Sequence, residues 1–463
     1  MKTKTTSLLF CFALLLILLS GCSDKAKKEK ESTTDLVTIQ KEEIPAKMQW
    51  FQDAKLGIFI HWGIYAVDGT SESWAFFRNE VPYDEYMSQA AGFTASKYDP
   101  EAWAKLFKEA GAKYAVLTSK HHDGVALWDT KFSDLNVVDK TPAARDLLTP
   151  YCDALRAEGL KVGLYFSHLD WSHPDYASTI PEEWSEKEDR NPFSYPEKGK
   201  EDPEAWERFL EFHRGQITEL MDQFNPDLYW FDGDWERTAE QFKMKELREY
   251  ILAAHPDAIL NSRMDGFGDY ATPEQGVPIN PPDGPWELCM TINDSWGFRF
   301  IDQNFKSSRQ IIQTFAECIG TGGNLLLDIG PREDGTIPEE EVNVLKDLGS
   351  WISRHEEAVY PTKKGLPFGH FYGPTTLNKS DDVIYLYVLD TPKEYVTLKG
   401  IRNKIKRVRV VGSDRDLNFK RFGGAAWQNI PGILYIDVPK DVNDEYITVL
   451  AVELEGALDL YHN

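Results

Sequence analysis

The sequence predicts an α/β protein, in which a (β/α)8-type (TIM-like) barrel over residues 46–360 is followed by a C-terminal β-sandwich over residues 366–460. In the first part, continuous apolar runs alternate with amphipathic stretches, as expected for parallel strands that are buried on both faces. In the second part, short apolar runs at close spacing with turn residues between them are typical of a sandwich. A doubly wound sheet is the alternative for the first part, but no GxGxxG follows its first strand.

The strands and helices are expected where these runs fall. The strand candidates of the barrel are Leu56–Gly63, Tyr114–Gly124, Leu160–Ser167, Asp227–Gly233, Asp257–Arg263, Trp286–Ile292 and Gly323–Pro331. The helix candidates, each with an apolar stripe, are Glu101–Gly111, Leu147–Gly159 and Trp206–Phe224. Seven strands leave one irregular or unseen element in a barrel of eight. After a linker over Pro361–Pro367, the sandwich strands are expected at VIYLYVLD, YVTLKGI, IKRVRVVGS, GILYIDVP and YITVLAVELE.

The N-terminus has the pattern of a bacterial secretory signal. Lys2 and Lys4 precede the apolar run LLFCFALLLILL, and LSGC at Leu19–Cys22 resembles a lipobox. We therefore predict a lipoprotein signal peptide over residues 1–22, lipidation of Cys22 and a solvated tether over residues 23–45. A plain signal peptide and a single-span anchor are the alternatives, although the run is short for a span. The expected location is the bacterial cell envelope, in the periplasm or on the outer membrane or cell surface, with membrane contact only through the lipid.

Composition excludes some functions. The net charge of −24, from 51 basic and 75 acidic side chains, argues against nucleic acid, whose phosphates require a basic surface. The remaining cysteines, Cys152, Cys289 and Cys318, are widely spaced, so neither a disulfide framework nor a zinc site is indicated. We expect no metal and no cofactor. The 14 Trp suit either sugar stacking or a Trp-rich core.

Polar side chains gather at the ends of the predicted strands. In barrels of this type the active site lies at the C-terminal ends of the strands. The residues found there are His61, Trp62, Lys120, His121, His122, Asp123, Ser167, His168, Asp232 and Arg263, with Asp170 and Trp171 just beyond the third strand and Glu274 in a later loop. Singly, each could be structural, and Asp232–Gly233 could be only a turn. His121 and His122 are adjacent, so on a strand they would point to opposite faces, which makes a shared metal awkward. Together these residues predict a site, because stability requires none of them there.

Asp and Glu beside neutral donors and aromatic rings suit glycoside hydrolysis, which uses two carboxylates across a sugar. Asp232 follows a rigid strand, and Arg263 is expected nearby to keep it ionised, so we predict that Asp232 is the nucleophile. Glu274 lies on a loop from which it can approach the leaving group. It is the better candidate for the general acid/base.

The motifs FIHWGIYAV, LTSKHHDGVALW, GLYFSHLDW, LYWFDG, PWELCMTINDSWGF and GNLLLDIGPREDG resemble, in order and spacing, those of the α-L-fucosidases of glycoside hydrolase family 29. The resemblance implies an exo-acting, retaining hydrolase that removes terminal α-L-fucose from oligosaccharides or glycoconjugates without a metal. It implies Asp232 as the nucleophile and Glu274 as the acid/base, with Glu287 as the rival. The sugar contacts that it implies are His61, Trp74, His121, His122, Tyr165, Trp230, Arg263 and Trp296.

Two positions depart from the family pattern. In SESWAFF, Ser73 stands where the family usually has Glu, and Glu72 is one residue away. In DIGP, Asp328 replaces the usual Asn and is either structural or a charge near the pocket. Three alternative functions remain open at this point: a related exo-glycosidase or transglycosylase acting on another sugar, a glycan-binding lipoprotein whose barrel no longer catalyses, and a metal-dependent hydrolase.

Overall fold

The computed structural model describes residues 45–413 and 415–461. Cys22, the predicted signal peptide and residues 23–44 of the predicted tether lie outside the described residues. Among the residues described, no helix is long and apolar enough to cross a membrane.

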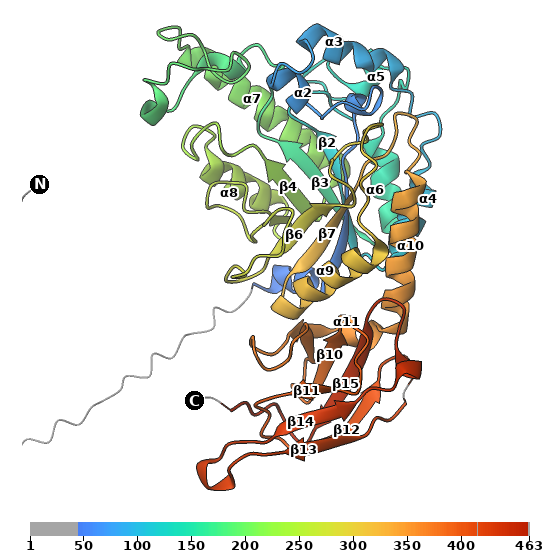
Figure 1. Ribbon diagram of the computed structural model, residues 1–463. Helices are drawn as coiled ribbons and strands as arrows, with labels where there is room; N and C mark the ends of the chain where they lie inside the picture. The colour runs from blue at the N-terminus through green and yellow to red at the C-terminus, as the bar shows by residue number, and fades with distance from the viewer. Residues whose placement is uncertain (1–44, 414, 462–463) are drawn as a thin grey trace, which may run out of the picture. The chain divides into compact units, whose positions relative to one another are not determined.

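Seven parallel strands form a curled sheet in the order β5-β4-β3-β2-β1-β7-β6 (Figure 1). They are β1 Leu56–Ile60, β2 Tyr114–Lys120, β3 Lys161–Ser167, β4 Leu228–Asp232, β5 Ile259–Leu260, β6 Glu287–Thr291 and β7 Asn324–Ile329. Almost every residue of these strands is buried, as expected for parallel strands covered on both faces. All seven predicted strands are therefore confirmed.

The eighth element of the barrel is irregular, as predicted. Isolated parallel bridges pair Asn261 with Tyr270, Ala271 with Trp286, and Glu274 with Cys289, so residues 270–274 link β5 to β6. This segment contains Pro273, which has no N–H to donate, and Gly- and Pro-rich sequence surrounds it. A regular strand cannot form under these conditions. The irregular element places Glu274 at the C-terminal ends of the strands, where Asp232 ends β4.

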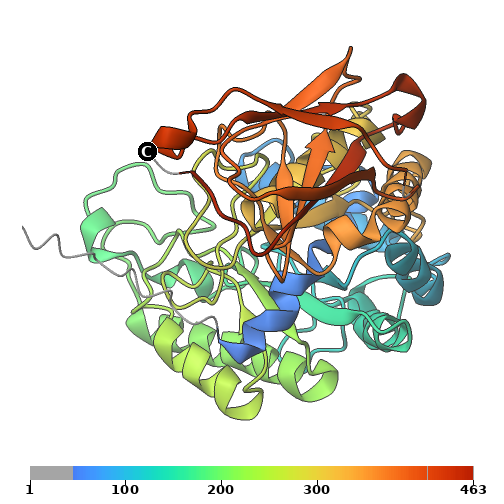
Figure 2. The same cartoon turned by 90° about the horizontal axis from the view of Figure 1, so that it is seen from below.

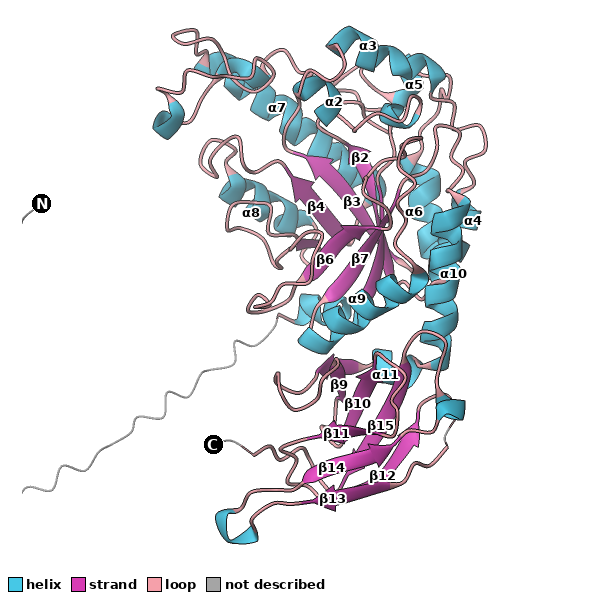
Figure 3. Ribbon diagram, in the orientation of Figure 1, coloured by secondary structure: helices cyan, strands magenta, loops and turns pink. Residues whose placement is uncertain are grey.

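Helices surround the curled sheet (Figures 2 and 3). The α-helices of the described residues are α1 Gln49–Ala54, α2 Trp74–Phe77, α3 Tyr83–Ser88, α4 Pro100–Glu109, α5 Val137–Lys140, α6 Leu148–Ala157, α7 Pro203–Glu219, α8 Met244–Ala254, α9 Ser308–Thr321, α10 Glu339–Arg354 and α11 Glu356–Val359, the last of which lies by the C-terminal part (Figure 1). Local sequence sets their starts: the Asp99 and Asp202 side chains cap α4 and α7, each with Pro at the first position, and Ser307 with Gln310 forms a capping box on α9. The three predicted helices, α4, α6 and α7, are confirmed.

The C-terminal part consists of a five-stranded sheet in the order β12-β15-β10-β9-β8 and a three-stranded sheet in the order β11-β14-β13. Its strands are β8 Thr362–Lys364, β9 Thr375–Asn378, β10 Val383–Val388, β11 Tyr395–Leu398, β12 Ile405–Val410, β13 Phe419–Phe422, β14 Ile433–Asp437 and β15 Thr448–Leu454. The five predicted strands are present. However, β8 occupies the segment predicted as a linker, because it pairs with β9. The indole Nε1 of Trp351 in α10 donates to the carbonyl of Ile447, 2.9 Å away, and ties this part to the barrel helices.

The interior of the barrel is a separate aromatic cluster. Phe59 on β1, Tyr165 on β3 and Trp230 on β4 share it, whereas their strand neighbours pack outward against the helices. Phe51 of α1 packs on Tyr114, the first residue of β2, and so covers the N-terminal end of the barrel. The C-terminal ends of the strands are left for polar residues.

Candidate active site

Strand alternation places the predicted residues on one inner face. Side chains two residues apart point the same way, so Asp232 follows Trp230 into the barrel and His61 follows Phe59. Tyr165 lies on the same face of β3 and reaches Asp232. Three separate strands thus direct side chains toward the same point at the C-terminal end of the barrel.

The Asp232 carboxylate is held by two side-chain donors. Its Oδ1 accepts from Nη1 of Arg263 at 2.7 Å, and its Oδ2 accepts from the Tyr165 hydroxyl at 2.9 Å. Nε2 of His122 lies 3.7 Å from Oδ2. The backbone carbonyl of Asp232 accepts from the backbone N–H of His168 at 2.7 Å. Carboxylate and backbone are therefore both fixed, as a nucleophile requires.

A single guanidinium joins the two candidate catalytic carboxylates. Arg263 donates through Nη1 to Asp232 and through Nη2 to Oε2 of Glu274, at 2.6 Å, while its guanidinium carbon lies 4.7 Å from the ring centre of Trp230. Burial opposes the charge on Arg263, but Asp232 and Glu274 raise its pKa above the usual value. The Glu274 side chain is 41% exposed and that of Asp232 11%. The structure thus pairs an enclosed carboxylate with an accessible one.

The three predicted histidines lie together. The rings of His121 and His122 are 4.2 Å apart and those of His61 and His121 are 6.0 Å apart. The expectation that His121 and His122 point to opposite faces is wrong, because β2 ends at Lys120 and both residues lie beyond the pleat. Burial lowers the pKa of all three, that of His121 to about 4, so each is a neutral imidazole near pH 7.

The hydroxyl of Ser167 determines the tautomer of His122. Its hydrogen is donated to the carbonyl of Leu169 at 2.8 Å, so Oγ accepts from Nδ1–H of His122 at 2.6 Å. Nε2 of His122 therefore carries a lone pair and can accept a hydrogen bond from a hydroxyl group of a ligand.

Tryptophans form one wall of the site. The ring centre of Trp74 lies 5.6 Å from that of His122, 5.0 Å from that of Trp171 and 6.1 Å from that of Trp235, whose ring is nearly parallel to it. On another side, Trp296 lies 4.9 Å from His61. Trp171 and Trp235 were not predicted as sugar contacts, although each follows a strand-end motif directly, in HLDW and FDGDW. This position, directly after a strand-end motif, is the sequence feature from which both could have been predicted.

Glu287 is enclosed below Trp230. It is fully buried and accepts from Trp230 Nε1 at 2.8 Å and from the Tyr114 hydroxyl at 2.5 Å. Burial raises its pKa to about 7, against the effect of these hydrogen bonds. Trp230 can therefore offer a ligand its ring but not its N–H. Glu287 has no open path to a leaving group, which favours Glu274 as the acid/base.

The departures from the family pattern have definite partners. Ser73 hydrogen-bonds Nδ1 of His121. Glu72 is buried, accepts from the backbone N–H of Gly297 at 2.7 Å, beside Trp296, and has its pKa raised to about 7 by burial. Asp328 lies 2.7 Å from Nδ1 of His61. Each of the three therefore supports a predicted sugar contact from behind.

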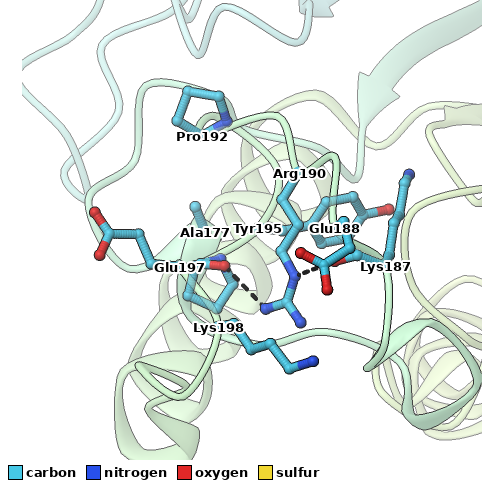
Figure 4. A pocket seen from close by; sticks show the side chains of 9 residues that line it. Ala177, Lys187, Glu188, Arg190, Pro192, Tyr195, Glu197 and Lys198 are labelled. Atoms are coloured by element: carbon cyan, nitrogen blue, oxygen red, sulfur yellow. Dashed lines mark hydrogen bonds between the residues drawn. The ribbon is translucent and has the colours of Figure 1, made fainter.

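A pocket of about 400 Å³ lies elsewhere, on the long segment between β3 and α7 (Figure 4). It is lined by Ala177, Lys187, Glu188, Arg190, Pro192, Tyr195, Pro196, Glu197 and Lys198, none of which is a predicted site residue. Arg190 is engaged with its own segment, donating to the carbonyls of Lys187 at 2.9 Å and Pro196 at 3.1 Å. The predicted residues meet at Asp232 and not in this pocket.

The neutral histidines predict a loss of stability in acid. The pKa of His121 is about 4 in the folded protein and near 6.5 in the unfolded chain. Its contribution to the free energy of unfolding is therefore fully present above pH 6.5 and is lost as the pH falls toward 4. Lowering the pH from 7 to 4.5 should reduce the free energy of unfolding by roughly 2–3 kcal/mol through His121. Urea unfolding at both pH values should show a smaller drop for His121→Gln than for wild type. His255→Gln, outside the site, is the control, and an equal drop in wild type and His121→Gln would contradict the assignment.

Known proteins are similar to this chain in fold and in sequence. A family model described as alpha-L-fucosidase matches residues 20–357. Tissue alpha-L-fucosidase of Macaca fascicularis is 31% identical over 381 residues, covering 76% of each chain. Alpha-L-fucosidase isoenzyme 1 from Paenibacillus thiaminolyticus superposes with a TM-score of 0.79 at 32% identity, covering 89% of this chain and 99% of that one. A Bacteroides thetaiotaomicron α-L-fucosidase of family GH29, solved as a trapped covalent intermediate, gives 0.77 at 28% identity, covering 89% and 96%.

The barrel and its paired carboxylates, together with these matches, define a glycoside hydrolase. The chain belongs to the α-L-fucosidase family, glycoside hydrolase family 29.

Proposed function

We propose that the protein is an exo-acting, retaining α-L-fucosidase that releases terminal α-L-fucose from oligosaccharides or glycoconjugates by double displacement. The observation that carries the proposal is the bridge of Asp232 and Glu274 by one guanidinium. Retaining enzymes hold their two carboxyl groups about 5–5.5 Å apart, whereas inverting enzymes leave about 6.5–9.5 Å for a water. Binding to the two nitrogens of a single Arg263 favours the closer spacing.

In the first step, an oxygen of Asp232 attacks the anomeric carbon while Glu274 gives its proton to the departing oxygen. Glu274 leaves Arg263 to do so, which its exposed position on the irregular segment permits. In the second step, Glu274 takes a proton from water, the water attacks the anomeric carbon, and Asp232 is released. Hydrogen bonds from Arg263 and Tyr165 stabilise the changing charge on Asp232 while its bond to the anomeric carbon forms and breaks.

A covalent intermediate was trapped in the Bacteroides thetaiotaomicron relative with 2-fluoro-fucosyl fluoride, which supports double displacement for this chain at 28% identity. Among the sugar contacts, we propose that His61 and His122 hydrogen-bond hydroxyls and that Trp74 and Trp296 pack on the apolar edge of fucose. His121 and Trp230 complete the walls.

The test is hydrolysis of aryl α-L-fucoside followed by proton NMR of the released sugar, with aryl α-L-galactoside as a matched control. The two sugars differ only in a hydroxyl on C6. We expect clear preference for the fucoside and α-L-fucose as the first anomer formed. Appearance of the β anomer first would contradict retention, and faster turnover of the galactoside would assign another sugar.

We also propose that Cys22 carries lipid and anchors the enzyme in the bacterial cell envelope. The sequence pattern around Leu19–Cys22 supports this. Cys22→Ser should move the protein from the detergent-extracted membrane fraction to the soluble fraction and abolish incorporation of labelled palmitate. Unchanged membrane retention of Cys22→Ser would contradict lipid anchoring.

A further inference from the structure

His61 is held from behind by the strand beside it. Its backbone N–H donates to the carbonyl of Ile329 at 3.1 Å, and its Nδ1 lies 2.7 Å from Oδ1 of Asp328. Asp328 is on β7, which pairs with β1 in parallel register. The ring of His61 therefore cannot turn without breaking the contact with Asp328.

The other nitrogen of His61 faces the site. No described residue hydrogen-bonds Nε2, and the ring lies 4.9 Å from Trp296 and 5.8 Å from Tyr165. The charged and titratable groups that act on His61 are His121, Asp232, His122 and Arg263, which are all site residues. Nε2 is thus the atom that a sugar hydroxyl meets.

The surroundings of Asp328 disfavour a negative charge. The residue is 1% exposed, and its Oδ2 has no hydrogen-bond partner among the described residues. Besides His61, the charged groups that act on it are Glu341 of α10, Glu72 and Lys306. Burial, followed by Glu341 and Glu72, raises the pKa of Asp328 well above its usual range. The His61–Asp328 pair is therefore best described as neutral overall.

We propose that Asp328 is a positioning residue that keeps a hydrogen on Nε2 of His61, which makes His61 a hydrogen-bond donor to a fucose hydroxyl. Because His61 is a neutral imidazole, the shared proton of a neutral pair lies on Oδ1 of Asp328, which donates it to Nδ1 of His61. The single imidazole hydrogen is then on Nε2. His122, whose Nε2 is bare, supplies the complementary acceptor. A donor and an acceptor on neighbouring strand ends would then fix the orientation of the sugar.

The donor role rests on the proposed function, but the position of the hydrogen can be measured without substrate. Nitrogen-15 NMR of histidine-labelled protein distinguishes a nitrogen that carries hydrogen from a bare one, and His61→Gln identifies the signals. In wild type, Nε2 of His61 should carry hydrogen. Asp328→Asn should keep it there, because the amide N–H can donate to Nδ1. Asp328→Leu, which has a similar volume but cannot hydrogen-bond Nδ1, should no longer keep the hydrogen on Nε2. Asp302→Asn, a buried carboxylate bonded to the backbone N–H groups of Asp294 and Asn304, should change nothing.

The same variants should be assayed on an aryl α-L-fucoside. We expect kcat/KM of Asp328→Asn within about threefold of wild type and a loss of about tenfold or more in Asp328→Leu, mostly in KM, as for one lost hydrogen bond. A bare Nε2 in wild type, or a loss in Asp328→Asn equal to that in Asp328→Leu, would overturn the proposal. If no fucoside is hydrolysed while the NMR pattern holds, the proposed function fails and the assignment of the hydrogen stands.

Discussion

Asp232→Asn should lower kcat on an aryl α-L-fucoside by about 10⁴-fold or more, because loss of a catalytic nucleophile has effects of this order or larger in other enzymes. Asn has nearly the same shape and can still accept from Arg263 or Tyr165 through its carbonyl oxygen. The site should therefore remain assembled, and KM should change little. The defect then reports the missing attack on the anomeric carbon and not a lost fold.

Asp234→Asn is the matched control for this prediction. Asp234 lies two residues further along the chain, in the turn that follows β4, and is only partly buried. It should retain activity within about tenfold of wild type, since surface and half-buried substitutions that leave the reacting groups intact have small effects. Equal losses in the two variants, with Asp232→Asn properly folded by circular dichroism, would remove Asp232 from the role of nucleophile.

Glu274→Ala should lower kcat/KM by about 10² to 10⁴-fold on a fucoside with a poor leaving group, the usual contribution of general acid–base catalysis. The loss should shrink for an aryl leaving group that departs without a proton. Azide should restore turnover by attacking the fucosyl-enzyme, and the product should be α-L-fucosyl azide, because two inversions retain configuration. In Asp232→Ala, azide can attack only the substrate and should give the β product.

Glu287→Ala is the comparison that separates the two glutamates. Glu287 bonds Trp230 and Tyr114 within the barrel, so its loss should lower stability and disturb Trp230. Azide should not restore activity to this variant. Rescue of Glu287→Ala, with α-L-fucosyl azide as the product, would transfer the acid/base role from Glu274 to Glu287.

Much of the barrel could be predicted because its strands are buried on both faces and stand out as apolar runs. The irregular eighth element could be expected but not located, since Pro273 and the glycines around it give no strand pattern. In the C-terminal part, β9 and β13 were missed. TTLN and FKRF are only four residues long and have no continuous apolar run, and they become strands by pairing with the strand that follows each of them.

The site could be predicted as far as strand ends define it. Asp232 and His61 follow from their places at strand ends, and Arg263 and Glu274 follow from their places after β5, whereas Tyr165 was predicted only from the family resemblance. Contacts between loops could not be predicted. The wall of Trp74, Trp171 and Trp235 brings together the short helix α2 and two loops that are remote in sequence. The faces of His121 and His122 were wrongly assigned, because the exact residue at which β2 ends decides them.

The central claim is that Asp232 forms a covalent bond to fucose. Incubation with 2-deoxy-2-fluoro-L-fucosyl fluoride, which slows release of the sugar from the enzyme, followed by peptide mass spectrometry, tests it most directly. We predict one fluorofucosyl group for each protein molecule, located on Asp232 in the peptide that contains LYWFDGDWE. A label on Glu274, Glu287 or any other side chain, or no label while the substrate is turned over with inversion, would contradict the account.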